Sequence, residues 1–293
     1  MKSKKNKRIY TSTSLSQYNR CPKLWYYYHI ASVEPPVSLL QLNTNVAFGS
    51  AMHEMFEVFL RNKIDSDNEM DLEIKLDKYT EATRMITSTV FEVVEEIHPF
   101  INSFKPIIVE SELYGNYEGI SIGGKLDAIV EYNDELWVLD HKTSTRKLDC
   151  KRHQISSQFD IYCWLARKKG YNVKGVIINF LRIPSIKRKK EEPDDKFYQR
   201  VKDEIYEVET TVSNKSSYFT MATITKTDSE VQSGMNDISD EIYHINTDDF
   251  YRRNTSSCFQ FNTPCEFFEV CTDQTPLDYL EQRRIEHPEL ALI

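Results

Sequence analysis

The chain has 293 residues, of which 40% are hydrophobic and 12% aromatic, so it can bury a substantial core. This composition excludes an intrinsically disordered chain. No run of about 18 apolar residues occurs, which excludes a transmembrane helix. Because the basic residues 1–9 lead into no apolar segment, they do not resemble a signal peptide. We therefore expect a cytoplasmic protein with no membrane partner.

The net charge of −8 argues against a nucleic-acid partner, although nucleic-acid binding needs only a local basic surface. Three basic clusters could provide one: residues 2–8, 187–190 and 252–253. The acidic segment 191–195 directly follows the second cluster, a pattern typical of a self-neutralising exposed loop. For each cluster, two interpretations stand: a nucleic-acid-binding surface or an ordinary solvated surface.

The first part of the chain predicts helices. Hydroxyl residues near position 11 can cap a short helix, and Pro22 favours the start of a second, aromatic-rich helix. Apolar side chains with helical spacing predict a helix over 50–61, and a longer helix is expected over 70–98.

The second half alternates strands and helices. Its expected elements are strands over 106–142, a helix over 155–169 ended by Gly170, an apolar strand over 175–182, a strand near 203–212 and a helix over 215–245. The last fifteen or so residues are expected to be helical or frayed. This order predicts a mixed α/β sheet with helices on its faces. We expect a single domain over 1–293, with a helical part 11–105, a catalytic core at about 106–182 and a C-terminal part 201–293.

Two short motifs carry the clearest chemistry: Gly-Lys-Leu-Asp at 124–127 and Asp-His-Lys-Thr at 140–143. They lie on two expected strands joined by a turn at Asn133 and Asp134. Residues two apart on a strand share a face, so Asp140 and Lys142 project together. Two carboxylates and an ammonium suit the binding of Mg²⁺ or Mn²⁺ and the activation of water for attack on a phosphodiester.

Four of the six cysteines form a second pattern. Cys258, Cys265 and Cys271 lie close together near the end of the chain, and Cys21 lies far upstream. Four thiolates suit a [4Fe–4S] cluster or a Cys₄ zinc site, and the absence of Cys-x₂-Cys pairs favours iron and sulfur. Buried free cysteines are an equally weighted alternative.

These features together resemble the PD-(D/E)XK nuclease superfamily, specifically the RecB-like exonucleases with an iron–sulfur cluster, which include the AddB nuclease domain and CRISPR-associated RecB-like nucleases. The resemblance rests on six motifs in the expected order: residues 14–22, 49–54, 124–127, 140–143, 158–162 and the three C-terminal cysteines. It implies a restriction-endonuclease-like α/β fold, with a mixed central sheet flanked by helices and helical insertions.

The resemblance also implies roles for individual residues. The divalent metal would be held by His53, Asp127, Asp140 and the backbone carbonyl of His141. Lys142 would orient the attacking water or stabilise the phosphate, and Gln158 and Tyr162 would face the site or the DNA. Glu110 is a candidate outer carboxylate, but Glu112 points the same way. The cluster would be held by Cys21, Cys258, Cys265 and Cys271.

The function implied is a metal-dependent DNA exonuclease that hydrolyses phosphodiester bonds on single-stranded DNA or DNA ends, in repair, recombination or phage DNA processing. A separate helicase partner is compatible with this, because the chain has no Gly-x₄-Gly-Lys-Ser/Thr phosphate loop. The alternative is a non-catalytic DNA-end-binding or scaffold subunit of a helicase–nuclease assembly. The presence of His53, Asp127, Asp140 and Lys142 favours the enzyme.

Overall fold

The computed structural model describes residues 8–35, 44–65, 75–98, 100–211, 217–260, 263–272 and 280–282. The chain forms two compact units, each assembled from separate segments. The first unit comprises Met1–Leu42, Glu112–Lys125 and Asp228–Ile293, and the second comprises Asn43–Ser111 and Leu126–Thr227. The expectation of one domain over 1–293 stays a prediction.

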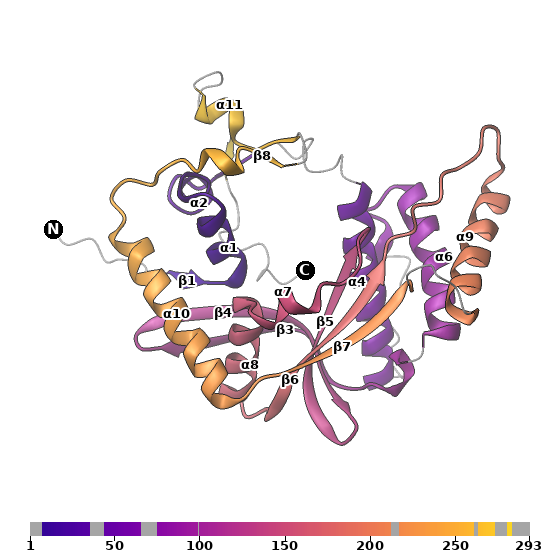
Figure 1. Ribbon diagram of the computed structural model, residues 1–293, viewed down its shortest axis with the longest axis horizontal. Helices are drawn as coiled ribbons and strands as arrows, with labels where there is room; N and C mark the ends of the chain where they lie inside the picture. The colour runs from indigo at the N-terminus through magenta and orange to yellow at the C-terminus, as the bar shows by residue number, and fades with distance from the viewer. Residues whose placement is uncertain are drawn as a thin grey trace. The chain divides into compact units, whose positions relative to one another are not determined.

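The second unit holds most of the sheet and its covering helices (Figure 1). Its helical elements are α4 (Thr44–Ile64), α6 (Glu81–Ile97), η1 (Ile101–Ser103), α7 (Cys150–Gln154), α8 (Ser157–Lys168) and α9 (Asp194–Thr210). Its strands are β5 (Glu135–Ser144), β6 (Val173–Arg182), β7 (Phe219–Thr225) and the adjoining parts of β3 (Lys105–Tyr117) and β4 (Ile120–Tyr132).

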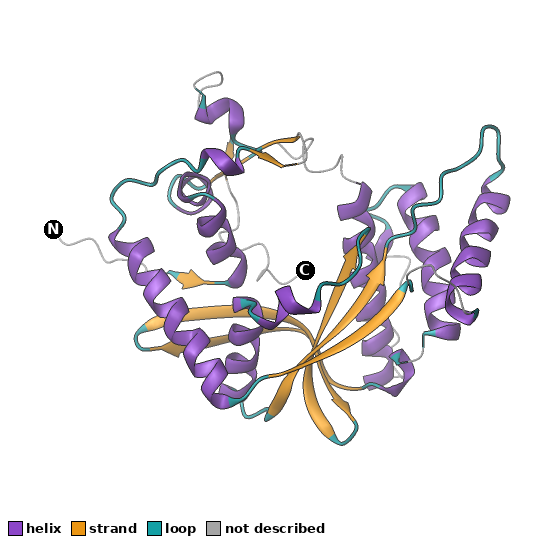
Figure 2. Ribbon diagram, viewed as in Figure 1, coloured by secondary structure: helices purple, strands orange, loops and turns teal. Residues whose placement is uncertain are grey.

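The main sheet has six strands, with the order β1-β4-β5-β6-β7 and with β3 paired to β4 (Figure 2). Strands β4 and β5 pair antiparallel, β5 and β6 parallel, and β6 and β7 antiparallel. The parallel pair is joined through α7 and α8, as a crossover between parallel strands requires. The predicted mixed sheet flanked by helices is confirmed.

Local sequence explains how these elements begin and end. Asn133 and Asp134 both have positive φ angles, 53° and 61°, which is the backbone of a tight hairpin turn between β4 and β5. The Thr80 hydroxyl caps α6, so this helix begins at Glu81 rather than near residue 70. Gly170 follows α8 with φ +94° and ends it, as expected.

Helices cover both faces of β5. Helix α4 contacts β5, and α6 packs against both α4 and α9. Their shared core contains Phe48, Met52, Phe56, Val90 and Val201. On β5, Lys142 donates a hydrogen bond to Gln158 of α8. The preceding residue, His141, stacks on Phe56 of α4. Because neighbouring residues of a strand point to opposite faces, α8 and α4 lie on opposite sides of the sheet.

The first unit is smaller and is built mostly from helices. Its elements are β1 (Ile9–Tyr10), α1 (Ser12–Arg20), α2 (Pro22–His29), β2 (Val33–Glu34), α10 (Asp228–Thr247), η2 (Thr255–Ser257), β8 (Phe259–Gln260), β9 (Thr263–Pro264), α11 (Phe268–Cys271) and β10 (Glu281–Gln282). Strand β1 pairs with β4, and β2 pairs with β10. No helix in the described ranges has the length and apolar character needed to cross a membrane.

Two expected elements are wrong. Residues 203–212 were expected to form a strand, but residues up to Thr210 belong to α9. Its buried Tyr198, Val201, Ile205 and Val208 have helical spacing, and this spacing outweighs the local alternation. The helix expected over 215–245 begins only at Asp228, because Phe219–Thr225 pairs with β6 as strand β7. The helix expected at the C-terminal end lies largely outside the described residues.

Candidate active site and cysteine cluster

The end of the β4–β5 pairing places the two aspartates of the motifs together. The last paired residues are Ala128 and Leu139, so Asp127 and Asp140 come directly after the ladder. The backbone N–H of His141 donates to Asp127 Oδ2 at 2.7 Å, which fixes the first carboxylate against the neighbouring strand. The hairpin therefore brings both motifs to one point of the sheet.

Asp140, Lys142, Gln158 and Tyr162 form a connected chain of polar side chains. Lys142 Nζ lies 2.9–3.0 Å from both Asp140 carboxylate oxygens and donates to Gln158 Oε1 at 3.1 Å. Gln158 Nε2 in turn donates to the Tyr162 hydroxyl at 3.0 Å, one turn further along α8. The four residues expected to act together from β5 and α8 are thus in contact.

His53, Glu110 and Asp127 form a second group beside this chain. His53 Nδ1, on α4, lies 3.5 Å from Asp127 Oδ2. One potential ligand atom from each of the three residues lies within 4.8 Å of the others, a spacing that could hold a metal ion. Carboxylate oxygens and one imidazole are a donor set that suits Mn²⁺ or Mg²⁺.

Glu110 reaches this group through an unusual backbone. Its φ of +47° is in the left-handed region, which is rare for a side chain other than glycine within a strand. Glu112 instead accepts a hydrogen bond from the Tyr114 hydroxyl at 2.6 Å. The structure therefore distinguishes two glutamates that the alternation of β3 could not separate.

The two aspartates have opposite pKa shifts. Burial raises the pKa of Asp140 to about 6; the Lys142 ammonium opposes this shift, and the Asp127 carboxylate adds to it. Burial also acts to raise the pKa of Asp127, but the charge and hydrogen bond of His53, with the contribution of His141, hold it below its usual value. For His53, the Asp127 carboxylate overcomes the effect of burial and raises the pKa.

The side chain of His141 belongs to a buried hydrogen-bond chain on the other face of the sheet. Its ring stacks on Phe56 at 4.1 Å, and its Nδ1 accepts from Asn179 Nδ2 at 2.9 Å. His98 Nε2 donates to Asn179 Oδ1 at 2.9 Å. Neither His98 nor Asn179 was predicted from the sequence as part of a site. The signal for Asn179 is its position as a lone polar residue within the apolar strand Val-Ile-Ile-Asn-Phe-Leu, because a buried amide needs hydrogen-bond partners.

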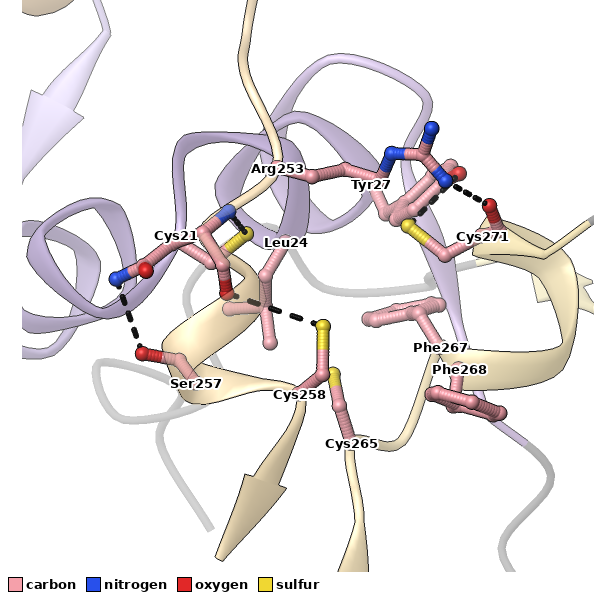
Figure 3. A pocket seen from close by; sticks show the side chains of 11 residues that line it. Cys21, Leu24, Tyr27, Arg253, Ser257, Cys258, Cys265, Phe267, Phe268 and Cys271 are labelled. Carbon is pink, nitrogen blue, oxygen red and sulfur yellow. Dashed lines mark hydrogen bonds between the residues drawn. The ribbon is translucent and has the colours of Figure 1, made fainter.

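The four cysteines expected to act together line one pocket in the first unit (Figure 3). Leu24, Tyr27, Phe267 and Phe268 complete its apolar lining. The Asn254 N–H donates to Cys21 Sγ at 3.3 Å, and the Cys265 N–H donates to the Cys258 carbonyl at 2.7 Å. Tyr27 Oη lies 3.9 Å from Cys271 Sγ, and burial raises the pKa of Cys265 to about 11.

The other two cysteines lie elsewhere. Cys150 is exposed at the start of α7, and Cys163 is fully buried in α8, where it belongs to the core. All six thiols are free. Convergence of four thiols from two distant parts of the sequence fits the donor set of an iron–sulfur or zinc site.

The mixed sheet and the acidic residues at the end of its paired strands define a nuclease of the restriction-endonuclease-like class. The chain belongs to the PD-(D/E)XK nuclease superfamily, whose sequence profile matches residues 10–272. Members of this superfamily are metal-dependent nucleases. No curated protein sequence gives a significant match.

A solved structure shares the fold at low sequence identity. A crystal structure from Eubacterium rectale, described as a "putative exonuclease", superposes with a TM-score of 0.53 at 13% identity, covering 92% of this chain and 89% of that one. The structure of SSO0001 has the same coverage of both chains at 14% identity, with a TM-score of 0.37, too low to support a comparison.

Proposed function

We propose that this protein is a metal-dependent DNA exonuclease that hydrolyses phosphodiester bonds on single-stranded DNA or DNA ends, in repair, recombination or phage DNA processing. The observation that carries the proposal is the meeting of His53, Glu110 and Asp127 with the Asp140–Lys142 pair beyond the last paired residues of β4 and β5. The "exonuclease" description of the Eubacterium rectale structure supports the preference for ends.

The donor set fits a hard divalent cation. Asp127 and Asp140 would provide oxygen ligands, the His141 carbonyl a further one, and His53 a nitrogen ligand, with Glu110 as an additional carboxylate. Asp140 Oδ2 is buried and accepts no well-oriented hydrogen bond from the described residues, although Lys142 Nζ lies 2.9 Å away. When bound, the cation would lower the pKa of a coordinated water and neutralise charge on the phosphate.

Lys142 is the group expected to act on the reacting phosphate. Asp140 and Gln158 hold its ammonium from two sides, so that it is fixed in position before substrate binds. A fixed positive charge stabilises the negative charge that develops on a phosphate during attack by water. Gln158 is in turn held by Tyr162, so these two residues orient Lys142 and can also contact the DNA backbone.

The test is digestion of labelled single-stranded DNA, linear or circular, with Mn²⁺, Mg²⁺ or EDTA. The wild-type protein should degrade only the linear DNA and only with metal. Asp140→Asn keeps the size of the side chain but removes its charge, so cleavage should fall by on the order of 10²–10³-fold. Glu131→Gln makes the same change of a carboxylate to an amide at a half-buried position of β4 that pairs with Lys105, and this matched control should cleave normally.

The scaffold alternative predicts a different result. A folded wild-type protein that binds DNA but cleaves neither substrate with either metal would contradict the nuclease proposal and favour a non-catalytic end-binding subunit. Cleavage of the circular DNA would contradict the exonuclease part alone. Equal activity of the wild type and Asp140→Asn would contradict the assignment of the site. A separate helicase partner remains compatible with each of the first two outcomes.

We further propose that Cys21, Cys258, Cys265 and Cys271 hold a [4Fe–4S] cluster with a structural role. The supporting observation is that the four thiols, and neither of the other two cysteines, line one pocket with an apolar and aromatic wall. Four thiolates are the ligand set that such a cluster requires.

A further inference from the structure

A strongly basic segment follows the catalytic strand. Residues 145–156 connect β5 to α8 and include Arg146, Lys147, Lys151 and Arg152, with Asp149 as the one acidic residue. All four basic side chains are exposed. This local excess of positive charge contrasts with the net charge of −8 for the whole chain. The segment is inconspicuous in the sequence, because its charges are interrupted rather than consecutive.

Three of the basic side chains in this segment are not neutralised by any described carboxylate. Lys147, Lys151 and Arg152 form no ion pair with any residue that the structure describes, and Asp149 Oδ1 accepts from the backbone N–H of Arg152 as the cap of α7. The cluster at 187–190 behaves differently, because Arg188 pairs with Asp194 and Lys190 with Glu191. Two of the four basic residues of 187–190 are therefore paired with the acidic residues that follow them, as expected for a self-neutralising loop, whereas Lys147, Lys151 and Arg152 have no such pair among the described residues.

The segment is held firmly beside the candidate active site. Lys226 Nζ donates to the Gln154 carbonyl at 2.9 Å and to Asp160 Oδ1 at 2.7 Å, and this ion pair is buried. The His153 ring stacks on Phe159 at 5.9 Å. Helix α8 begins at Ser157, directly after the segment, and its Gln158 accepts a hydrogen bond from Lys142 at 3.1 Å, so the segment ends beside that lysine.

Ile155 is exposed at the turn between α7 and α8. Its side chain is 85% exposed, the largest exposed fraction among the large apolar residues that the structure describes. The turn is nevertheless ordered, because the Ile155 and Ser156 N–H groups both bond to the His153 carbonyl. Ile155 also lies three residues before Gln158, which bonds Lys142. A single exposed apolar side chain needs no explanation by itself. Ile155 becomes a candidate contact for a base because three exposed cations, Lys147, Lys151 and Arg152, precede it within eight residues.

We propose that residues 146–155 bind a single DNA strand next to the scissile phosphodiester, with Lys147, Lys151 and Arg152 contacting phosphates and Ile155 packing against the face of a base. The inference rests on the proposed nuclease function and extends it to the path of the strand. Unpaired cations bind phosphates without regard to sequence, and an apolar side chain can cover a base only where the base is unstacked.

The test measures DNA binding separately from cleavage. Binding of a fluorescent single-stranded oligonucleotide is followed by anisotropy in EDTA over a range of salt concentrations. Each phosphate contact contributes about 0.7 to the slope of log K against log salt, so the Lys147→Ala/Lys151→Ala/Arg152→Ala variant should lose about 2 units of slope. The control Lys187→Ala/Lys189→Ala/Lys190→Ala removes the same charge from exposed positions of the same unit and should keep the slope.

Ile155→Ala tests the apolar contact. It should weaken binding of the single strand by about three- to tenfold at fixed salt, without changing the slope, because no charge is removed. Binding of a blunt duplex should change less. Ile64→Ala, at another exposed isoleucine, is the matched control. An equal loss on single strand and duplex would overturn the base contact.

The outcomes separate this inference from the proposed function. An unchanged slope in the basic-segment variant overturns the inference, whether or not the wild type cleaves DNA. A reduced slope together with an inactive wild type supports the binding surface and contradicts the nuclease proposal. Thermal unfolding of each variant checks the fold, and the three single substitutions, each expected to lower the slope by about 0.7, replace the triple variant if it unfolds.

Discussion

Asp127 and Asp140 are identical side chains that the fold places in different electrostatic surroundings. Asp127 contacts His53 and the His141 N–H, which favour its ionised form. Asp140 is almost fully buried, and the charges of Lys142 and His53 do not offset the effect of burial on its pKa. Such a divergence of pKa values between paired groups is typical of a catalytic site and supports the proposed function.

Lys142→Met should separate catalysis from metal binding. The substitution removes the ammonium but leaves His53, Glu110 and Asp127 in place, so we expect cleavage to fall on the order of 10²–10³-fold while Mn²⁺ still binds. Calorimetric titration with Mn²⁺ and a single-turnover cleavage assay measure the two effects. Lys105→Met, on the exposed part of β3, is the control. Loss of Mn²⁺ binding equal to that of Asp140→Asn would contradict the role given to Lys142.

His98 should make the protein sensitive to acid. Burial lowers its pKa to about 4, whereas an unfolded histidine has a pKa of about 6.5. Between these values the unfolded chain binds one more proton, so the free energy of unfolding should decrease by about 1.4 kcal/mol per pH unit as the pH falls. The total contribution of this group is roughly 3 kcal/mol.

Urea unfolding of the wild type and His98→Gln between pH 7 and pH 4.5 measures this effect. The glutamine keeps a donor for Asn179 but cannot bind a proton, so the pH slope of its stability should be smaller by the contribution of one group. Identical slopes in the two proteins would contradict the role of His98.

At the scale of elements, the pairing of β6 with β7 depends on a close approach at Gly175. A Cβ at this position would collide with the Ile224 carbonyl oxygen and lie 2.9 Å from Thr225 Cα. Both are backbone atoms of the paired strand, so they cannot move aside without disturbing the ladder. The glycine is therefore required by the sheet and not by its own backbone angles.

Gly175→Ala should accordingly lower the free energy of unfolding by about 2–4 kcal/mol. Gly170→Ala is the matched control. It strains a backbone with φ +94° but meets no atom within 4 Å, so its effect should be about 1 kcal/mol. Urea denaturation of the two variants measures the difference. Equal effects would show that the close contact across the β6–β7 pair does not contribute to the free energy of unfolding.

The elements that were wrongly expected show the limit of local patterns. Residues 203–212 alternate well enough for a strand, but the buried positions of α9 follow helical spacing and pack against α6. Residues 219–225 lie next to a strongly helical segment, and their pairing with β6 makes them a strand. In both cases contacts with a distant element outweigh the weak local preference.

At the scale of the whole molecule, the proposed cluster would join parts of the chain that are far apart in sequence. Cys21 lies in the cap of α2, and the other three cysteines follow α10. Closing so long a loop restricts the unfolded chain, so loss of the cluster should destabilise the protein by on the order of 5 kcal/mol in a chain-entropy estimate.

Cys21→Ser is therefore expected to lose iron and visible absorbance and to unfold at lower temperature after anaerobic purification. Cys150→Ser, at an exposed cysteine outside the pocket, should retain both properties. Metal analysis by mass spectrometry and thermal unfolding provide the measurements. Zinc in place of iron would favour the Cys₄ zinc site, and equal iron in both variants would contradict the assignment of Cys21.

The sequence alone determined the features that depend on neighbouring residues. The turn at Asn133 and Asp134, the shared face of Asp140 and Lys142, and the spacing of Gln158 and Tyr162 all follow from local backbone geometry, which acts over a few residues. The order of the motifs was sufficient to predict the superfamily and the mixed sheet, both of which are confirmed.

Only the tertiary structure decided which distant residues meet. It placed Glu110 rather than Glu112 beside His53 and Asp127, linked His98 through Asn179 to His141, and gathered four cysteines around one pocket. It also brought the chain back to Lys142 after the basic segment, through the hydrogen bond to Gln158. These contacts depend on how the sheet and helices pack, and packing is set by the whole core rather than by the few residues that make each contact.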